Sequence, residues 1–209
     1  MNVLVFGASG ATGHELVRQA LNQGHKVTAF VRTPSKLKIT HDNLKLVEGN
    51  VSQYPVVEQA IRGQDIIFST LGASNPFRFD QSVVEGISNI IQAMQHSVVK
   101  RLIYLSFIGV PESRNDGGFV IKYITPKLLK TEIAGHELRE KMIRKSELDW
   151  TIVRAPTLTK GPGKGEYRSG EELKSHAFTV TISRADVADF MLKQMNDSSF
   201  IRKAVRIMY

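Results

Sequence analysis

The stretch Asn2–Gly13, which reads N-V-L-V-F-G-A-S-G-A-T-G, decides the fold of this chain. The apolar run Val3–Phe6 is typical of a buried strand, and glycines follow it at Gly7, Gly10 and Gly13. Glycine permits a tight turn and lets a pyrophosphate approach the backbone closely. The N–H groups and the positive dipole end of a following helix attract the same anion. The order strand, glycine turn and helix therefore indicates a dinucleotide site, and the alternative is a turn that serves packing alone.

Length and composition favour one domain with a sizeable core, since the chain has 209 residues of which 42% are hydrophobic. No run reaches the ~18 apolar residues of a membrane span, and no basic leader precedes the first strand. We therefore expect a cytoplasmic protein without membrane contact. The absence of cysteine excludes disulfides and thiol catalysis, and the six histidines lack the spacing of metal ligands.

The net charge of +8 indicates a basic surface that attracts a polyanionic cofactor or substrate, or a nucleic acid. The basic residues are scattered along the chain, and neither a zinc-finger spacing nor a basic-aromatic RNA motif is present. We therefore do not expect a nucleic acid as the main partner.

Strand-like and helix-like segments alternate along the chain. The predicted strands are Val3–Phe6, Lys26–Val31, Leu44–Val47, Asp65–Ser69, Arg101–Leu105, Trp150–Val153 and Ala204–Met208. The predicted helices begin with apolar Leu16, Val17, Ala20 and Leu21 and continue with Val56–Ile61, Gln81–His96, a segment from Thr125 to about Lys145, and Ser183–Met195. Ser183 and Thr125 are the expected N-caps, the latter with Pro126 in the first turn. This pattern predicts an α/β Rossmann fold, a doubly wound and mostly parallel sheet in a single domain over residues 1–209.

Two polar segments interrupt this alternation at about residues 111–124 and 157–177. Each follows a predicted strand of the sheet, so each lies at the carboxyl edge where ligands bind in such folds. They are candidate substrate-side lids, and the alternative is that they are ordinary exposed connections.

The end of the second strand bears on the choice of cofactor. NAD sites of this type place Asp or Glu there to bind the ribose hydroxyls, but this chain reads V-R-T-P-S-K over Val31–Lys36. Arg32 carries a permanent charge and a bidentate donor set, which suits a 2′-phosphate. The sequence therefore favours NADP(H) over NAD(H), unless Arg32 is merely a solvated surface residue.

Several motifs together resemble the atypical short-chain dehydrogenase/reductases. They are G-A-S-G-A-T-G at Gly7–Gly13, L-G-A at Leu71–Ala73, R-L-I-Y-L-S-F-I-G-V at Arg101–Val110 and L-D-W-T-I-V-R-A-P at Leu148–Pro156. Within that family the chain is similar to the biliverdin-IXβ reductase/flavin reductase type and to bacterial NADH-flavin reductases. The resemblance spans nearly the whole chain and implies the same fold and a nicotinamide cofactor.

The resemblance also implies roles for individual residues. Those assigned to the pyrophosphate are Gly7, Ser9, Gly10, Ala11, Thr12 and Gly13. Arg32 is assigned to the 2′-phosphate, and Asn50 and Val51 to the adenine, although Asn50 replaces the usual Asp. Leu71, Gly72 and Ala73 are assigned to the ribose and diphosphate, and Pro156, Thr157 and Leu158 to the nicotinamide.

Candidate catalytic residues are fewer. The larger family uses a Tyr-x-x-x-Lys pair with a Ser, and the chain has Tyr123 and Lys127 at that spacing, although Pro126 stands inside the motif. Ser106 ends the fifth strand, where it reaches the nicotinamide amide, a substrate or only the local backbone. Relatives carry a second hydroxyl where this chain has Phe107. His136, with Glu132 and Glu140 at helical spacing, is interpreted as a surface residue of a charge network.

These observations predict an NADPH-dependent oxidoreductase that transfers hydride to a planar acceptor such as a flavin or a quinone. The cofactor carries that chemistry and the pocket supplies orientation, so a convincing protein acid is not required. The alternative is a non-catalytic regulatory protein that senses NADP(H). We expect no metal, and either a monomer or a homodimer.

Overall fold

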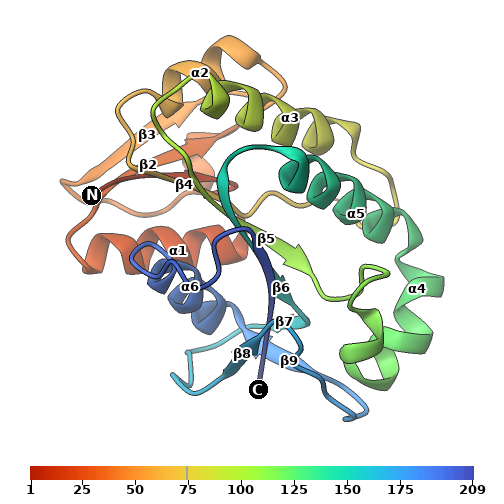
Figure 1. Cartoon of the computed structure of the whole chain (residues 1–209). Coiled ribbons are helices and arrows are strands. Elements are labelled where there is room, and N and C mark those ends of the chain that lie inside the picture. The colour runs from red at the N-terminus through yellow and green to blue at the C-terminus, as the bar shows by residue number, and fades with distance from the viewer. Residues whose placement is uncertain (74) are drawn as a thin grey trace.

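A twisted, eight-stranded sheet forms the centre of the molecule in the computed structural model, which describes residues 1–73 and 75–209 (Figure 1). The strand order is β3-β2-β1-β4-β5-β6-β10-β8. The strands are β1 (Asn2–Phe6), β2 (Lys26–Val31), β3 (Leu44–Glu48), β4 (Ile66–Ser69), β5 (Arg101–Phe107), β6 (Asp149–Ala155), β8 (Arg168–Gly170) and β10 (Lys203–Met208). Every neighbouring pair is parallel except β10 and β8. The predicted doubly wound, mostly parallel Rossmann sheet is confirmed.

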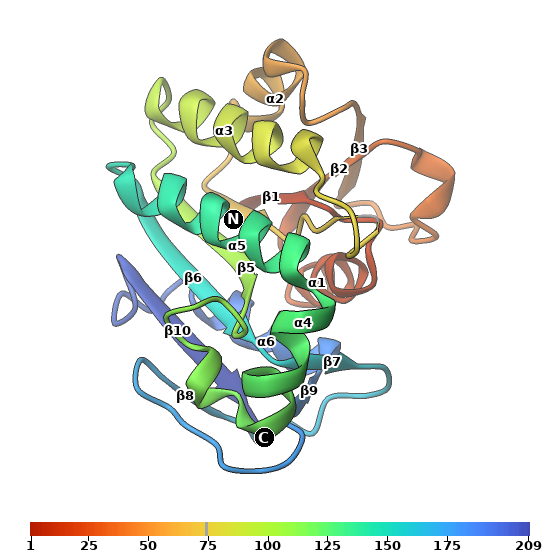
Figure 2. The same cartoon turned by 90° about the vertical axis from the view of Figure 1, so that its right-hand side faces the viewer.

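Helices cover both faces of this sheet (Figures 1 and 2). Helices α1 (Ala11–Asn22) and α6 (Arg184–Lys193) pack together on one face. On the other face α2 (Tyr54–Ile61) packs against α3 (Gln81–Gln95), and α3 against α5 (Lys130–Lys145). Buried side chains form one large apolar core on each side of the sheet. The strands are therefore apolar on both faces, as a covered parallel sheet requires.

The alternation of side chains along β1 shows how one strand contributes to both cores. Val3 and Val5 lie in the core beneath α1 and α6, whereas Leu4 and Phe6 lie in the core beneath α2, α3 and α5. Strand β1 pairs with β2 on one side and with β4 on the other, so the chain reverses its direction of travel across the sheet here. Ligands of open α/β sheets bind in the crevice at such a switch point.

The helix predicted from Thr125 to Lys145 is interrupted. A π-helical turn, η3 (Val120–Ile124), leads directly into the short α4 (Thr125–Leu128), and Leu129 separates α4 from α5. Thr125 is not an N-cap, because its dihedral angles are helical (φ −56°, ψ −40°) and its hydroxyl donates to the Val120 carbonyl at 3.2 Å. Pro126 therefore sits inside a helix that is already under way. The other predicted cap is confirmed, since Ser183 Oγ accepts from the Asp186 N–H at 2.9 Å.

The two segments predicted as separate loops are joined to one another. The N–H groups of Phe119 and Val120 donate to the carbonyls of Ala177 and Phe178, each at 3.0 Å. The shorter elements of this region are η2 (Arg114–Asp116) and the two-stranded sheet of β7 (Thr157–Thr159) and β9 (Thr181–Ser183). Another short element, η1 (Pro34–Lys36), lies between β2 and β3. Strand β8 also falls within the second predicted loop. Across residues 1–73 and 75–209, no helix has the length and apolar character needed to cross a membrane.

Candidate functional site

The glycine turn is shaped by the close approach of three backbone segments. Gly7 has φ +79°, and a Cβ on it would lie 2.8 Å from Thr70 Oγ1. A Cβ on Gly13 would collide with the Gly7 carbonyl group. A Cβ on Gly10 would meet only the Gly7 carbonyl oxygen, at 3.2 Å. Gly7 and Gly13 are therefore required by the backbone itself, whereas Gly10 leaves free the space at the start of α1.

The N-terminus of α1 is open to an anion. Its N-cap, Gly10, supplies no side chain to bind the first-turn N–H groups. Unsatisfied N–H groups at the positive end of a 12-residue helix form an anion-binding site next to the glycine turn. A cradle that a Cβ would fill and free backbone donors together fit a dinucleotide pyrophosphate.

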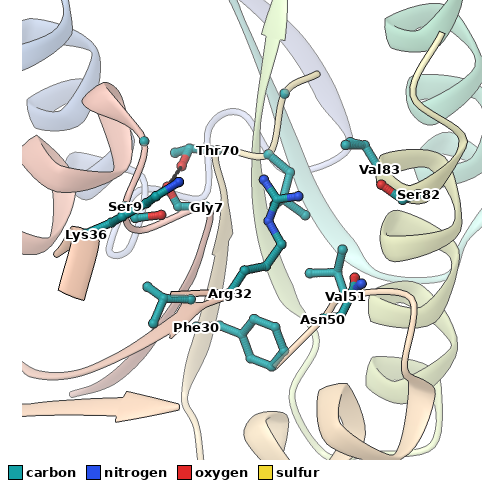
Figure 3. Close-up of a pocket in the computed structure, with 14 residues that line it drawn as sticks. Gly7, Ser9, Phe30, Arg32, Lys36, Asn50, Val51, Thr70, Ser82 and Val83 are labelled. Atoms are coloured by element: carbon teal, nitrogen blue, oxygen red, sulfur yellow. Dashed lines mark hydrogen bonds between the residues drawn. The ribbon is translucent and has the colours of Figure 1, made fainter. Parts of the chain in front are cut away.

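A cavity of about 270 Å³ lies beside the turn, at the carboxyl ends of β1, β2 and β4 (Figure 3). Two cations reach it, Arg32 from the end of β2 and Lys36 from η1. No carboxylate belongs to its lining among the described residues. The lining residues are Gly7, Ser9, Gly10, Phe30, Val31, Arg32, Lys36, Asn50, Val51, Thr70, Leu71, Gly72, Ser82 and Val83. This end of the crevice is therefore electropositive.

A second cavity, of about 440 Å³, continues from the first toward β5 and β6. The two share Gly10, Thr70, Leu71 and Gly72, so they form one groove along the edge of the sheet. The other lining residues of the second cavity are Ala11, Thr12, Ala73, Leu105, Ser106, Phe107, Leu129, Glu132, His136, Ala155, Pro156, Leu158 and Arg184. Its walls are mainly apolar.

The groove brings together most of the residues that the sequence analysis predicted to bind the cofactor. Gly7, Ser9, Gly10, Arg32, Asn50 and Val51 line the first cavity; Gly10, Ala11, Thr12, Ala73, Ser106, Pro156 and Leu158 line the second; Leu71 and Gly72 line both. Gly13 and Thr157 are not among the lining residues of either cavity. Asn50 makes a local turn, since its Oδ1 accepts from the Ser52 N–H at 3.2 Å.

Tyr123 and Lys127 are also outside the lining of both cavities. The Tyr123 side chain is exposed, and its ring centroid lies 5.0 Å from that of Phe119. Lys122 Nζ lies 5.0 Å from the Tyr123 ring centroid. The structure therefore does not bring this Tyr-x-x-x-Lys pair to the groove.

Ser106 lines the second cavity but is held by a buried ion pair. Its hydroxyl donates to Glu140 Oε1 at 2.6 Å. Arg154 of β6 binds the same carboxylate twice, through Nε at 3.1 Å and a terminal nitrogen at 2.6 Å. Burial alone would lower the pKa of Arg154, but hydrogen bonds and attraction to Glu140 and Glu112 raise it. The Ser106 proton is thus directed into this network rather than into the cavity.

The interpretation of His136 as a surface residue is wrong, although it does belong to a charge network. Its side chain is only 11% exposed. Its Nδ1 lies 3.3 Å from Tyr104 Oη and 3.2 Å from Ser106 Oγ, and its Nε2 lies 3.1 Å from Glu132 Oε1. Burial lowers the pKa of His136, an effect that Glu132 opposes in part, so the neutral ring predominates at pH 7.

Glu132 connects this histidine to a buried arginine. Its Oε1 also contacts a terminal nitrogen of Arg139 at 3.3 Å. Burial by itself would raise the pKa of Glu132, but hydrogen bonding and attraction to His136 and Arg139 outweigh it and lower the pKa. Glu132 is therefore a carboxylate that lines the second cavity.

Sequence reasoning missed Thr70 and underrated Glu132 and His136. Thr70 Oγ1 contacts the carbonyls of Phe6 and Gly7, each at 3.2 Å, and lines both cavities. A signal for Glu132 and His136 was present, since they stand four residues apart, the spacing expected of a Tyr-x-x-x-Lys pair. A second signal was Arg154, a permanent charge directly after the apolar residues Ile152 and Val153, which needs a carboxylate partner if it is buried.

A doubly wound sheet with a glycine turn and an open helix N-terminus at its switch point defines a dinucleotide-binding protein. The chain matches the model of the NAD(P)H-binding family over residues 7–198, and it belongs to that family. The resemblance to atypical short-chain dehydrogenase/reductases agrees with this assignment.

Named relatives point in several functional directions. The photosystem II assembly factor Ycf39 of Synechocystis sp. is 26% identical over 97% of this chain, which spans 61% of that longer protein. ChuY, an anaerobillin reductase from Escherichia coli O157:H7, superposes with a TM-score of 0.79 at 21% identity, over 99% of this chain and 96% of its own. A wide-type short-chain dehydrogenase/reductase from Veillonella parvula, in complex with NADP, has a TM-score of 0.76 at 20% identity, over 99% and 93% of the two chains. The structural likenesses establish the fold.

Proposed function

We propose that this protein is an NADPH-dependent oxidoreductase that transfers hydride to a planar acceptor such as a flavin or a quinone. The observation that carries the proposal is the continuous groove, which is cationic at one end and mainly apolar at the other. A dinucleotide that follows the glycine turn spans both ends. When bound, its nicotinamide supplies the hydride.

The preference for NADP(H) rests on Arg32 and Lys36. Both line the first cavity, and the described part of the chain offers neither of them an ion-pair partner. Both cations are therefore available to a 2′-phosphate, whereas the carboxylate that would bind the ribose hydroxyls of NAD is absent from the described lining.

The second cavity suits a flat acceptor stacked on the nicotinamide. Leu105, Phe107, Leu129, Pro156 and Leu158 give it apolar walls. Such walls exclude water and fix the orientation of an aromatic ligand, while the few polar groups set its register.

Steady-state oxidation of NADPH by an added acceptor tests this proposal. Purified protein with NADPH and FMN, or with NADPH and a soluble quinone, is expected to lose reduced-nicotinamide absorbance, more slowly with NADH at equal concentration. Titration of protein fluorescence with each dinucleotide measures binding separately. NADPH binding without oxidation across a broad acceptor panel would contradict the reductase.

A second candidate is a protein that senses the redox state of NADP(H). Ser106, whose proton is directed at Glu140, and Phe107, which replaces a second hydroxyl, favour it. A sensor must bind NADPH and NADP⁺ with different affinities, because a ligand with equal affinity for two states shifts neither. Equal affinities together with steady acceptor reduction would exclude this alternative.

A further inference from the structure

The second cavity contains one pair of titratable side chains that the sequence did not assign to chemistry. Glu132 and His136 both line it, and the 3.1 Å contact between Glu132 Oε1 and His136 Nε2 connects them. They stand four residues apart on α5, so they project from the same face of that helix. Two hydroxyl groups nearby have other partners: that of Ser106 donates to Glu140 Oε1 at 2.6 Å, and that of Tyr104 lies 3.3 Å from His136 Nδ1.

We propose that Glu132 and His136 are the proton-donating pair of this site, with Glu132 contacting the acceptor and His136 supplying its proton. This inference rests on the proposed reductase function and adds to it the source of the proton. For each hydride received, the acceptor takes one proton from the Glu132 carboxyl group. Once protonated, His136 donates its Nε2 proton to the Glu132 carboxylate and becomes neutral, and the ring then takes up a new proton from solvent. One NADPH, one acceptor and one proton thus give NADP⁺ and the dihydro product.

Glu132 is the member of the pair with a free oxygen. Its contacts with His136 and Arg139 both fall on Oε1. Within the described residues, Oε2 has no protein donor, and Glu132 lines the cavity. An acceptor in the cavity therefore meets an unoccupied carboxyl oxygen.

His136 has hydrogen-bond partners in both of its protonation states. As a neutral ring it accepts from the Tyr104 hydroxyl at Nδ1 and directs the Nε2 proton at Glu132. As a cation it donates from Nδ1 to Ser106 Oγ, whose own proton is already directed at Glu140. A ring that keeps its orientation in either state is suited to receive and release a proton.

The charges around His136 limit how readily it is protonated. On α5 it faces Glu132, Glu140 and Arg139, and on β5 it faces the uncharged Tyr104 and Ser106. Burial and, to a smaller extent, Arg139 lower the pKa of His136, while Glu132 and Glu140 oppose them. The protonated pair therefore becomes more populated as pH falls below 6.5, the ordinary value for histidine.

The experiment compares wild type with Glu132→Gln and His136→Gln, and with Glu137→Gln as the matched control on the exposed face of α5. We expect kcat for acceptor reduction to fall about 100-fold in the first two variants, with little change in NADPH affinity and no change in the control. Wild-type kcat should rise as pH falls below 6.5, and both variants should lose that rise. Circular dichroism and melting temperatures show whether each variant is folded.

A second measurement does not depend on turnover. Histidine NMR signals of the cofactor-free protein are titrated with pH, and His136 is assigned by its absence in His136→Gln. We expect its pKa to lie below 6.5 and to fall further in Glu132→Gln, because the supporting carboxylate is lost. An unchanged His136 titration in Glu132→Gln overturns the pair, as do variants that keep wild-type kcat and pH dependence. A wild type that binds NADPH but reduces no acceptor instead overturns the proposed function, and the proton role with it.

Discussion

The two ends of the groove are built in different ways. The main features of the first cavity are a glycine turn, an open helix N-terminus and two free cations, and all of them fall within the first 36 residues. The second cavity depends on a buried network in which α5 contributes Glu132, His136 and Glu140, while β5 and β6 contribute Ser106 and Arg154. One end of the groove is therefore encoded by a short stretch of sequence, whereas the other forms only when distant strands and helices come together.

The largest expected effect comes from breaking the network behind the second cavity. Glu140→Ala leaves the Arg154 guanidinium, 1% exposed, without its buried carboxylate. We expect a loss of about 3 kcal/mol in unfolding free energy, because the exposed Glu112, 2.8 Å from Arg154, compensates the buried charge only in part. Urea denaturation measures it, and Glu137→Ala on the same helix should change stability by no more than about 0.5 kcal/mol. Equal stabilities of the two variants would show that the network is not what holds this end together.

The next effect tests the locally encoded end. Gly10→Val places a side chain where the anion would lie, while its Cβ meets only the Gly7 carbonyl oxygen within the protein. We expect NADPH affinity to fall at least about 100-fold with the fold intact, since the pyrophosphate loses its approach to the backbone. Fluorescence titration and circular dichroism check this. The control is Gly170→Val on β8, where a Cβ would meet Leu173 Cβ at 3.9 Å. Wild-type affinity in Gly10→Val would refute the assignment of the turn.

This difference between local and long-range features also explains which parts of the fold and of the site could be predicted from the sequence. The doubly wound sheet, the alternation of strands and helices and most of the first cavity could be predicted from local patterns. Examples are the apolar run Val3–Phe6, the spaced glycines that follow it and Arg32 at the end of the second strand. The segment 120–129 did not, since Pro126 looks like a helix start unless the preceding π-helical turn is known. His136 was placed at the surface because charged residues on a helix usually face water, and only Arg154 and Tyr104 on distant strands explain why it is buried.

A smaller effect separates NADPH from NADH. Arg32→Ala removes a charged donor from the first cavity, so NADPH affinity should fall about 10- to 100-fold while NADH affinity changes little. Lys38→Ala, an exposed cation outside the lining, is the charge-matched control. Parallel titrations with both dinucleotides check the prediction. An equal loss for both would mean that Arg32 does not contact the 2′-phosphate.

The smallest effect is the pH dependence of stability that His136 contributes. Its pKa is lowered in the folded protein, first by burial, from the value of 6.5 that holds in the unfolded chain. Below pH 6.5 the unfolded chain therefore binds more protons than the folded protein, and stability falls as pH decreases until the folded pKa is passed. His25 contributes in the same direction, since burial also lowers its pKa, so wild type must be compared with His136→Gln. We expect the variant to lose less unfolding free energy than wild type between pH 7 and about 5 in urea titrations. Parallel curves for the two proteins would mean that the ring is equally protonated in both states, and that the second cavity does not bury it as the network implies.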